Sequence, residues 1–519
     1  MAVLQATDKN NLPEARHQEI ADGDAGVPTI ADHGLVSGPI RHLSPEENKR
    51  VLRRIDLILM PIMFISYGLQ YMDKAILGAA SQFGVVEDVG LYDVVMANGK
   101  PQIDLTKFSL ATLIFYWGFA AGAFPASFLS SRFPIGIFCG LSVFVWGLVT
   151  MAAALVHSYS GMMALRFFLG FIEAAIPAAF SLIIAMWYKP DEQPLRFAIW
   201  VSASGIGGVL GTVLLWGVGH INGSLSPWKY QFIVLGTITT AWGILLAVAM
   251  PRSPASAYFL SEKDRTLAVD RIRACQTAAT DEGFKLHQVK EAFQDPKTWA
   301  YIFVTFSCQL ANGAVSGFGP IIISSFGFGP LQSVLIAGSL GGTLLLSMVA
   351  AGLITSFIPN QKCNVAFATC LPIIIGCAIV WKASWNSLGV PLFGFLLVGF
   401  FATPYVMILS LVTANTAGQT KKVVVTGMVW FAYCVSNGVA PLLVRSTEQA
   451  QHYPSLFIPI LSLLSAGLLV LIALRWYLSA CNKSREADAL SNGGSTQSPD
   501  ETASLDLTDK ENPNFRYHL

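Results

Sequence analysis

The chain has 519 residues, of which 53% are hydrophobic and only 13% are charged, and its formal net charge is +1. Soluble proteins carry about 25% charged residues, so the composition excludes an ordinary soluble protein, and the near-zero net charge excludes a broadly basic surface for nucleic acid. The mean hydropathy of +0.54 indicates an all-α membrane protein instead.

Twelve apolar runs of the chain are long enough to cross a bilayer as helices, which takes about 20 residues each. The predicted spans are 55–80, 107–130, 135–157, 161–187, 196–219, 230–250, 297–323, 330–358, 362–382, 386–414, 423–446 and 453–479. Polar residues 251–296 divide them into six and six. The sequence therefore predicts two six-helix bundles, 55–250 and 297–480, with a pocket where the bundles meet.

The segments outside the bundles are polar. We expect residues 1–54 and 481–519 to be disordered tails, because they lack long apolar runs. The linker contains S-E-K-D-R-T at 261–266, which is typical of a helix start.

Cations place the loops relative to the membrane. Many of them fall in loops on the same side as the linker: Lys49, Arg50, Arg53, Arg54, Arg132, Lys189, Arg196, Lys362, Lys421, Lys422, Lys483 and Arg485. By the positive-inside rule this side is cytosolic, so both termini are expected in the cytosol.

Four ionisable residues interrupt the apolar spans of the first bundle: Asp73, Lys74, Arg166 and Glu173. One charge near the bilayer centre costs about 2.5–3.5 kcal/mol, so a span tolerates it only where it faces protein or water. Arg166 and Glu173 are seven residues apart and therefore lie on one helix face. From the helix rise, Asp73, Lys74 and Arg166 share a depth, with Glu173 about 10 Å further toward the midplane.

The signs of these charges suggest roles. Lys74 and Arg166 can bind a carboxylate. Glu173 and Asp73, once removed from water, can pass between neutral and charged forms and so carry a proton. The alternative is a structural cluster of ion pairs that fixes one helix against the other, although such pairs are costly inside a membrane.

The spans of the second bundle and their ends hold neutral polar residues: Gln309, Asn312, Asn415, Gln419, Tyr433 and Asn437. These side chains can hydrogen-bond the hydroxyls, amides or ring nitrogens of a substrate. For each residue singly, a structural bond between helices is the alternative.

Small residues predict close packing rather than chemistry. Four glycines, Gly205, Gly207, Gly208 and Gly211, would let the span at 196–219 approach its neighbours closely. Cys363, Cys370 and Cys377 repeat every seven residues and form an apolar stripe. We predict no disulfide framework, metal site or cofactor from this spacing.

Six motifs follow one another along the chain. The first predicted span reads R-R-I-D-L-I-L-M-P, followed by Y-G-L-Q-Y-M-D-K-A-I-L-G-A-A, and the fourth contains R-F-F-L-G-F-I-E-A-A-I-P. Later motifs are P-W-K-Y-Q-F-I at 227–233, P-R-S-P at 251–254, N-T-A-G-Q-T-K-K at 415–422 and Y-C-V-S-N-G-V-A-P at 433–441. The ordered set resembles the major facilitator superfamily, in the anion:cation symporter branch of fungal allantoate, nicotinate and pantothenate permeases.

The resemblance implies the major facilitator fold and a set of site residues. It implies substrate binding by Tyr71, Lys74, Arg166 and Asn437, and proton coupling by Asp73 and Glu173. The chain departs from the branch at two positions, because Lys74 stands where Arg is usual and Ile76 replaces an Asn. Lysine lacks the planar fork of arginine, so the mode of carboxylate binding differs at this position.

We therefore predict a monomeric secondary active transporter of small organic anions, which works by alternating access as a proton symporter in the plasma membrane. Its partners would be the organic anion, the proton and the lipid bilayer, with no cofactor and no nucleic acid. Export of an acidic or neutral metabolite is the first alternative, and a membrane nutrient sensor that does not transport is the second. An enzyme is not predicted, because no H-E-x-x-H, G-x-S-x-G or comparable motif is present.

Overall fold

The computed structural model describes residues 44–97, 100–189, 192–221, 223–276, 285–491 and 506–519. Among these residues, 12 helical stretches are long and apolar enough to cross a membrane. They are Pro45–Phe83, Thr106–Ser130, Ile135–Leu155, Tyr159–Trp187, Leu195–Val218, Pro227–Ala249, Pro296–Ser325, Pro330–Phe357, Lys362–Lys382, Gly389–Asn415, Gln419–Leu443 and Pro454–Asp488. Each coincides with one predicted span, so the predicted all-α membrane fold is confirmed.

The first bundle packs its helices in pairs: α4 along α8, α3 against α5 and α1 against α7. Its elements are α1 (Pro45–Ala80), a 3₁₀ turn (Ser81–Phe83), α2 (Val85–Val89), β1 (Asp93–Ala97), β2 (Lys100–Asp104), α3 (Thr106–Arg132), α4 (Ile135–Ala152), a 3₁₀ turn (Ala153–Leu155), α5 (Tyr159–Glu173), α6 (Ala175–Trp187), α7 (Gln193–Val218) and α8 (Pro227–Ala249). The two strands form an antiparallel hairpin between the first two spans.

The linker and the second bundle follow. They comprise a 3₁₀ turn (Pro254–Ser256), α9 (Glu262–Gln276), α10 (Leu286–Gln294), α11 (Pro296–Ser325), α12 (Pro330–Ala337), α13 (Ser339–Phe357), α14 (Lys362–Lys382), α15 (Gly389–Val398), a 3₁₀ turn (Gly399–Phe401), α16 (Ala402–Asn415), α17 (Gln419–Val439), two 3₁₀ turns (Ala440–Leu443 and Ser446–Gln451) and α18 (Pro454–Ser491). The helix start predicted at 261–266 is confirmed by α9, whose first turn is capped by the Ser261 hydroxyl.

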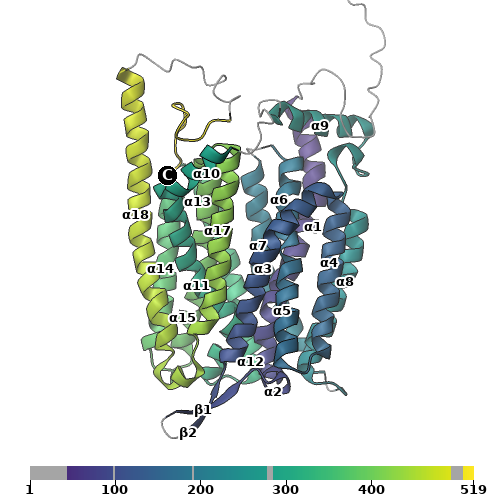
Figure 1. Ribbon diagram of the computed structural model, residues 1–519, viewed down its shortest axis with the longest axis vertical. Coiled ribbons are helices and arrows are strands. Elements are labelled where there is room, and N and C mark those ends of the chain that lie inside the picture. The colour runs from purple at the N-terminus through teal and green to yellow at the C-terminus, as the bar shows by residue number, and fades with distance from the viewer. Residues whose placement is uncertain (1–43, 98–99, 190–191, 222, 277–284, 492–505) are drawn as a thin grey trace, which may run out of the picture. The chain divides into compact units, whose positions relative to one another are not determined.

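The two ends of the bundles carry different elements (Figure 1). We call the ends beside α9 and α10 the linker face, and the ends beside β1 and β2 the hairpin face. At the linker face, Arg50 and Arg54 of α1 bind Asp264 of α9. Arg271 of α9 binds Glu192 before α7, with 2.6 Å between nitrogen and oxygen. These ion pairs hold α9 on the first bundle, whereas α10 packs on α17 and α11 of the second.

The prediction of disordered tails is wrong where the structure describes them. The helix α1 begins at Pro45, with Ser44 and Glu47 forming a capping box, and α18 continues to Ser491. Residues 506–519 lie against the second bundle, where Asp509 is fully buried. Their polar composition suggested disorder, but their polar groups bind partners from distant parts of the chain. Residues 1–43 and 492–505 lie outside the described residues.

Hydrogen bonds between the bundles lie toward the hairpin face. The Ser109 hydroxyl of α3 donates to the carbonyl oxygen of Pro441 at 2.8 Å. The Ser446 hydroxyl donates to the carbonyl oxygen of Ile103 in β2 at 2.6 Å. These bonds join the two bundles at the end opposite to the linker.

Glycines bring helix backbones into direct contact near the middle of α7. A methyl group at Gly205 would lie 2.8 Å from the carbonyl oxygen of Gly341 in α13, across the boundary between the bundles. A methyl group at Gly207 would lie 2.5 Å from the carbonyl oxygen of Gly68 in α1. The close approach predicted for these glycines is confirmed, and it fixes α1 beside α7.

We expect Gly207→Ala to lower the stability of the protein, because the added methyl group must push α1 and α7 apart. Overpacking of this kind costs about 1–3 kcal/mol. The matched control is Gly217→Ala in the same helix, where the added group would meet no other described part of the chain within 4 Å. Thermal unfolding of both variants in detergent checks this. Equal midpoints for the two variants would contradict the close contact.

Candidate functional site

The fourth membrane span is interrupted at the position of Glu173. The helix α5 ends at Glu173, α6 begins at Ala175, and Pro177 follows in the first turn. A proline has no backbone N–H, so Pro177 cannot bond the carbonyl oxygen four residues earlier, which is that of Glu173. The side-chain amide of Gln70 in α1 donates to this oxygen at 3.2 Å. The break in the helix thus attaches α1 to the residue that carries the buried carboxylate.

Four charged side chains of the first bundle form one cluster. Glu173 interacts electrostatically with Lys74, Asp73 and Arg166, and Arg166 interacts with Asp73. Asp73 and Glu173 have no exposed surface, and Arg166 is 1% exposed. The structure therefore brings together the four residues that the sequence singled out. Two cations and two anions make the cluster neutral overall when all four groups are charged.

Buried polar atoms of this cluster retain bonding capacity. Asp73 accepts a hydrogen bond from the Thr150 hydroxyl of α4 at 3.0 Å. The guanidinium carbon of Arg166 lies 5.0 Å from the centre of the Phe115 ring. Among the described residues, no group hydrogen-bonds to the Glu173 carboxylate oxygens or to two of the Arg166 nitrogens with good geometry. The Glu173 oxygens can accept a hydrogen bond from a solute or a water molecule, and the Arg166 nitrogens can donate one.

Lys74 links the charged cluster to the second bundle. It is one residue after Asp73 on α1 and therefore points about 100° away from it. Its ammonium nitrogen lies 5.4 Å from the centre of the Phe119 ring and 5.9 Å from that of Tyr433 in α17. Lys74 and Tyr71 are partly exposed, whereas Asp73 is buried. The cation thus lies where the two bundles meet.

The neutral polar residues of the second bundle gather beside Tyr433. The Asn312 amide donates to the side-chain oxygen of Gln309 at 2.8 Å, and the Asn437 amide donates to the same oxygen at 3.4 Å and to the backbone oxygen of Tyr433 at 2.9 Å. Asn437 is fully buried. In this conformation the Asn437 amide nitrogen therefore makes the structural bond between helices that was the predicted alternative to substrate binding.

Two of the predicted polar residues lie elsewhere. Asn415 bonds the backbone of His518, and the backbone N–H of Gln419 donates to Asp506, both at the linker face. The structural alternative therefore holds for the Asn415 side chain, which bonds within the protein, and both residues lie at the linker face. They end α16 and begin α17, outside the depth of the charged cluster.

A cavity of about 620 Å³ opens at the linker face beside α1 and α7. Its walls are Lys49, Leu52, Arg53, Asp56, Leu57, Met60, Pro61, Phe64 and Ile199. We call it the vestibule. At about 100° per residue, Tyr67, Tyr71 and Lys74 continue the face of α1 that lines it, and all three are partly exposed. One face of α1 therefore leads from the linker face to the cation between the bundles.

Several residues of the site were not singled out from the sequence. Gln70 and Thr150 bond members of the charged cluster, and Tyr67 packs edge-on against Trp200 at 5.2 Å between ring centres. A lone amide such as Gln70 within an apolar run was the available signal. Its partner could not be read from the sequence, because Glu173 is 103 residues away.

Comparison with known proteins identifies the family. Residues 63–441 match the Major Facilitator Superfamily. An uncharacterized transporter of Schizosaccharomyces pombe is 30% identical, with 98% of this chain and 94% of that protein covered. The chain belongs to the Major Facilitator Superfamily. It is therefore a multi-pass membrane transporter and not an enzyme.

Other members of the Major Facilitator Superfamily cover most of the chain. The allantoate permease of Saccharomyces cerevisiae is 28% identical over 92% of this chain and 88% of its own. The xylose transporter XylE of E. coli, in a partially occluded inward open conformation, shares the fold with a TM-score of 0.58 at 13% identity, covering 80% of this chain and 96% of its own. The resemblance to fungal permeases predicted from the motifs is confirmed.

We expect Gln70→Leu to lower the thermal stability of the protein, because it leaves the carbonyl oxygen of Glu173 without a partner inside the membrane. An unsatisfied buried acceptor costs about 1–3 kcal/mol. Adding Pro177→Ala supplies an N–H to that carbonyl and should recover most of the loss. Thermal unfolding of the two single variants and the double variant measures this coupling. Additive losses would mean that Gln70 does not compensate for the proline.

Proposed function

We propose that this transporter carries small organic anions together with protons, by alternating access. The observation that supports this most is the position of Lys74, partly exposed between the bundles and within electrostatic reach of the buried Glu173. A cation at that place can bind a carboxylate from the vestibule. The similarity to a permease named for allantoate, which is itself a carboxylate, agrees with this substrate class.

Substrate binding is assigned to Tyr71, Lys74, Arg166 and Asn437. Tyr71 and Lys74 are the partly exposed members and would contact the anion first. Arg166 holds positive charge behind them, and its free nitrogens are available when the cluster rearranges. The side-chain oxygen of Asn437 is likewise free of hydrogen bonds from the described residues and can accept one from a substrate hydroxyl or amide.

Proton coupling follows from the charge balance of the cluster. Two cations and two anions cancel, so a bound carboxylate leaves one uncompensated negative charge in a medium of low dielectric constant. Such a charge is costly, and protonation of one buried carboxyl restores neutrality. Glu173 is the proposed proton carrier, because Lys74 is the cation that acts on it most and would then pair with the substrate. Asp73, held by Thr150, is the second candidate.

We place the linker face in the cytosol, because the basic loops lie on that side. Both termini are then cytosolic, and the vestibule opens inward while hydrogen bonds close the hairpin face. The proposed setting is a monomer in the plasma membrane. Export of an acidic or neutral metabolite would use the same charge balance in reverse, and a sensor would bind the anion without moving it.

We expect Glu173→Gln to abolish uptake driven by a proton gradient while leaving counterflow exchange of the substrate. The amide cannot release a proton, but it leaves the anion-binding cations in place. Uptake in proteoliposomes, with and without a collapsed gradient, separates the two activities. Glu87→Gln, at an exposed side chain of α2, is the matched control. Loss of both activities in Glu173→Gln would make that carboxylate structural, and uptake by the native protein without a gradient would argue against symport.

We expect Lys74→Met to weaken the uptake of carboxylates by at least about tenfold, because a charge-assisted bond contributes about 1.5–3 kcal/mol. Lys74→Arg keeps the charge and should keep binding, with altered preference among carboxylates. A radiolabelled uptake screen that starts with allantoate and other small carboxylates measures both variants. If the native protein takes up only neutral solutes, and Lys74→Met does not change that uptake, the proposal of an anionic substrate is contradicted.

A further inference from the structure

The last residues of the chain form an ordered segment on the linker face of the second bundle. We call residues 506–519 the C-terminal segment. Arg485 of α18 donates to the backbone oxygens of Asp509 and Phe515, each at 2.6 Å. The backbone N–H of Lys362, which begins α14, donates to the carbonyl oxygen of Leu519 at 2.9 Å. The segment thus binds to α18 and to the start of α14.

Asp509 anchors this segment. Its carboxylate is fully buried and binds the ammonium groups of Lys297 and Lys421, the latter at 2.8 Å. Burial alone would raise the pKa of Asp509, but the two lysines outweigh it and hold the pKa below its ordinary value. The carboxylate therefore stays charged, and the contact stays formed, throughout the physiological pH range.

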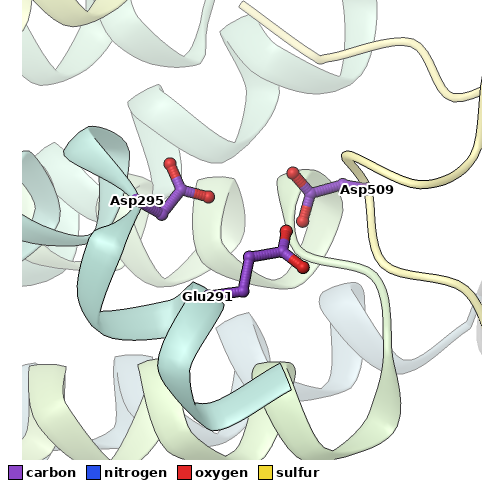
Figure 2. Close-up of side chains that lie close together, drawn as sticks. All are labelled: Glu291, Asp295 and Asp509. Carbon is purple, nitrogen blue, oxygen red and sulfur yellow. The ribbon is translucent and has the colours of Figure 1, made fainter. Parts of the chain in front are cut away.

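Three carboxylates converge at this place (Figure 2), namely Glu291, Asp295 and Asp509. Lys421 binds all three at 2.8 Å, and Lys297 binds Asp295 at 2.9 Å, so each acid is paired with an ammonium group although one negative charge is left over. With Asp509 present the cluster carries three acids and two lysines. Without it, two acids and two lysines remain and balance. The segment can therefore leave without exposing an uncompensated buried charge.

The helices that Asp509 connects are those that carry the second bundle's part of the candidate site. Lys297 lies in the first turn of α11, which holds Gln309, and Lys421 lies in the first turn of α17, which holds Asn437. Asp509 also accepts a bond from the backbone N–H of Ala417, in the turn before α17. The C-terminal segment thus ties α11 and α17 together at their linker-face ends.

We propose that the C-terminal segment is a reversible autoinhibitory clasp that holds the transporter open toward the linker face. In this conformation the bundles are bonded at the hairpin face and the vestibule is open at the linker face. Alternating access requires the linker-face ends of α11 and α17 to approach the first bundle. The docked segment occupies those ends and opposes that movement, and its release permits closure.

The test follows the vestibule directly and needs no substrate. Leu57 lines the vestibule and is 63% exposed. The probe is Leu57→Cys in the full chain, in which Cys275 and the partly exposed Cys481 are changed to Ser so that they do not react. The protein is reconstituted in nanodiscs, and its rate of reaction with a charged maleimide is measured. Release of the segment by Asp509→Asn should slow labelling at least twofold, because the vestibule is then closed for more of the time.

The matched control is Glu511→Gln, which removes one negative charge from the same segment at a side chain that is 40% exposed and lies 3.5 Å from His287. The amide oxygen of glutamine can still accept the hydrogen bond that the Thr508 N–H donates to Glu511. This variant should leave the labelling rate unchanged. In a chain that ends at residue 505, labelling should slow likewise, and a synthetic peptide of residues 506–519 should restore it. An unchanged rate in Asp509→Asn, or an equal effect of Glu511→Gln, would overturn the proposal. If the shortened chain does not fold, the two point variants decide the question.

Discussion

The structure depends on the cost of holding charge inside a membrane. Two cations and two anions lie in the first bundle at positions where lipid would make each of them expensive. They persist because they neutralise one another and because one of them, Lys74, faces the boundary with the second bundle. A neutral cluster of this kind resists any change in its charge. For that reason the anion and the proton that we propose as co-substrates would favour each other's binding.

The position of the cluster rests on a local weakness of the backbone. Pro177 leaves the carbonyl oxygen of Glu173 without its helical partner, and Gln70 of α1 takes its place. One proline therefore determines where α1 is attached to the fourth span. The attachment positions Asp73 toward α4, and the next residue, Lys74, toward the second bundle. The hydrogen bond between Gln70 and the Glu173 carbonyl does not depend on the four charged side chains. The positions of Asp73 and Lys74, in contrast, depend on that hydrogen bond.

The membrane spans and the buried charges could be predicted from the sequence, because both depend on the composition of one continuous stretch of chain. Long apolar runs define the spans, and a charge inside such a run must face protein or water, which singled out Lys74 and Glu173. Long-range pairing could not be predicted in the same way. Gln70 looked like an isolated amide, and Asn415 looked like a site residue although it binds His518 at the linker face. The C-terminal segment has the composition of a disordered tail, and only its distant partners reveal that it is ordered.

The helix α1 joins these features into one mechanism. One of its faces lines the vestibule and ends at Lys74, and an adjoining face carries Gln70 and Asp73 into the first bundle. The step of about 100° between neighbouring residues thus separates Lys74, the proposed anion-binding cation, from Asp73 while keeping the two in electrostatic contact. Because the same helix contacts α7 and α11, a rocking movement of the bundles must move Lys74 relative to Tyr433. In the proposed mechanism, release of the anion from Lys74 and the return of Lys74 to Glu173 are then parts of a single movement.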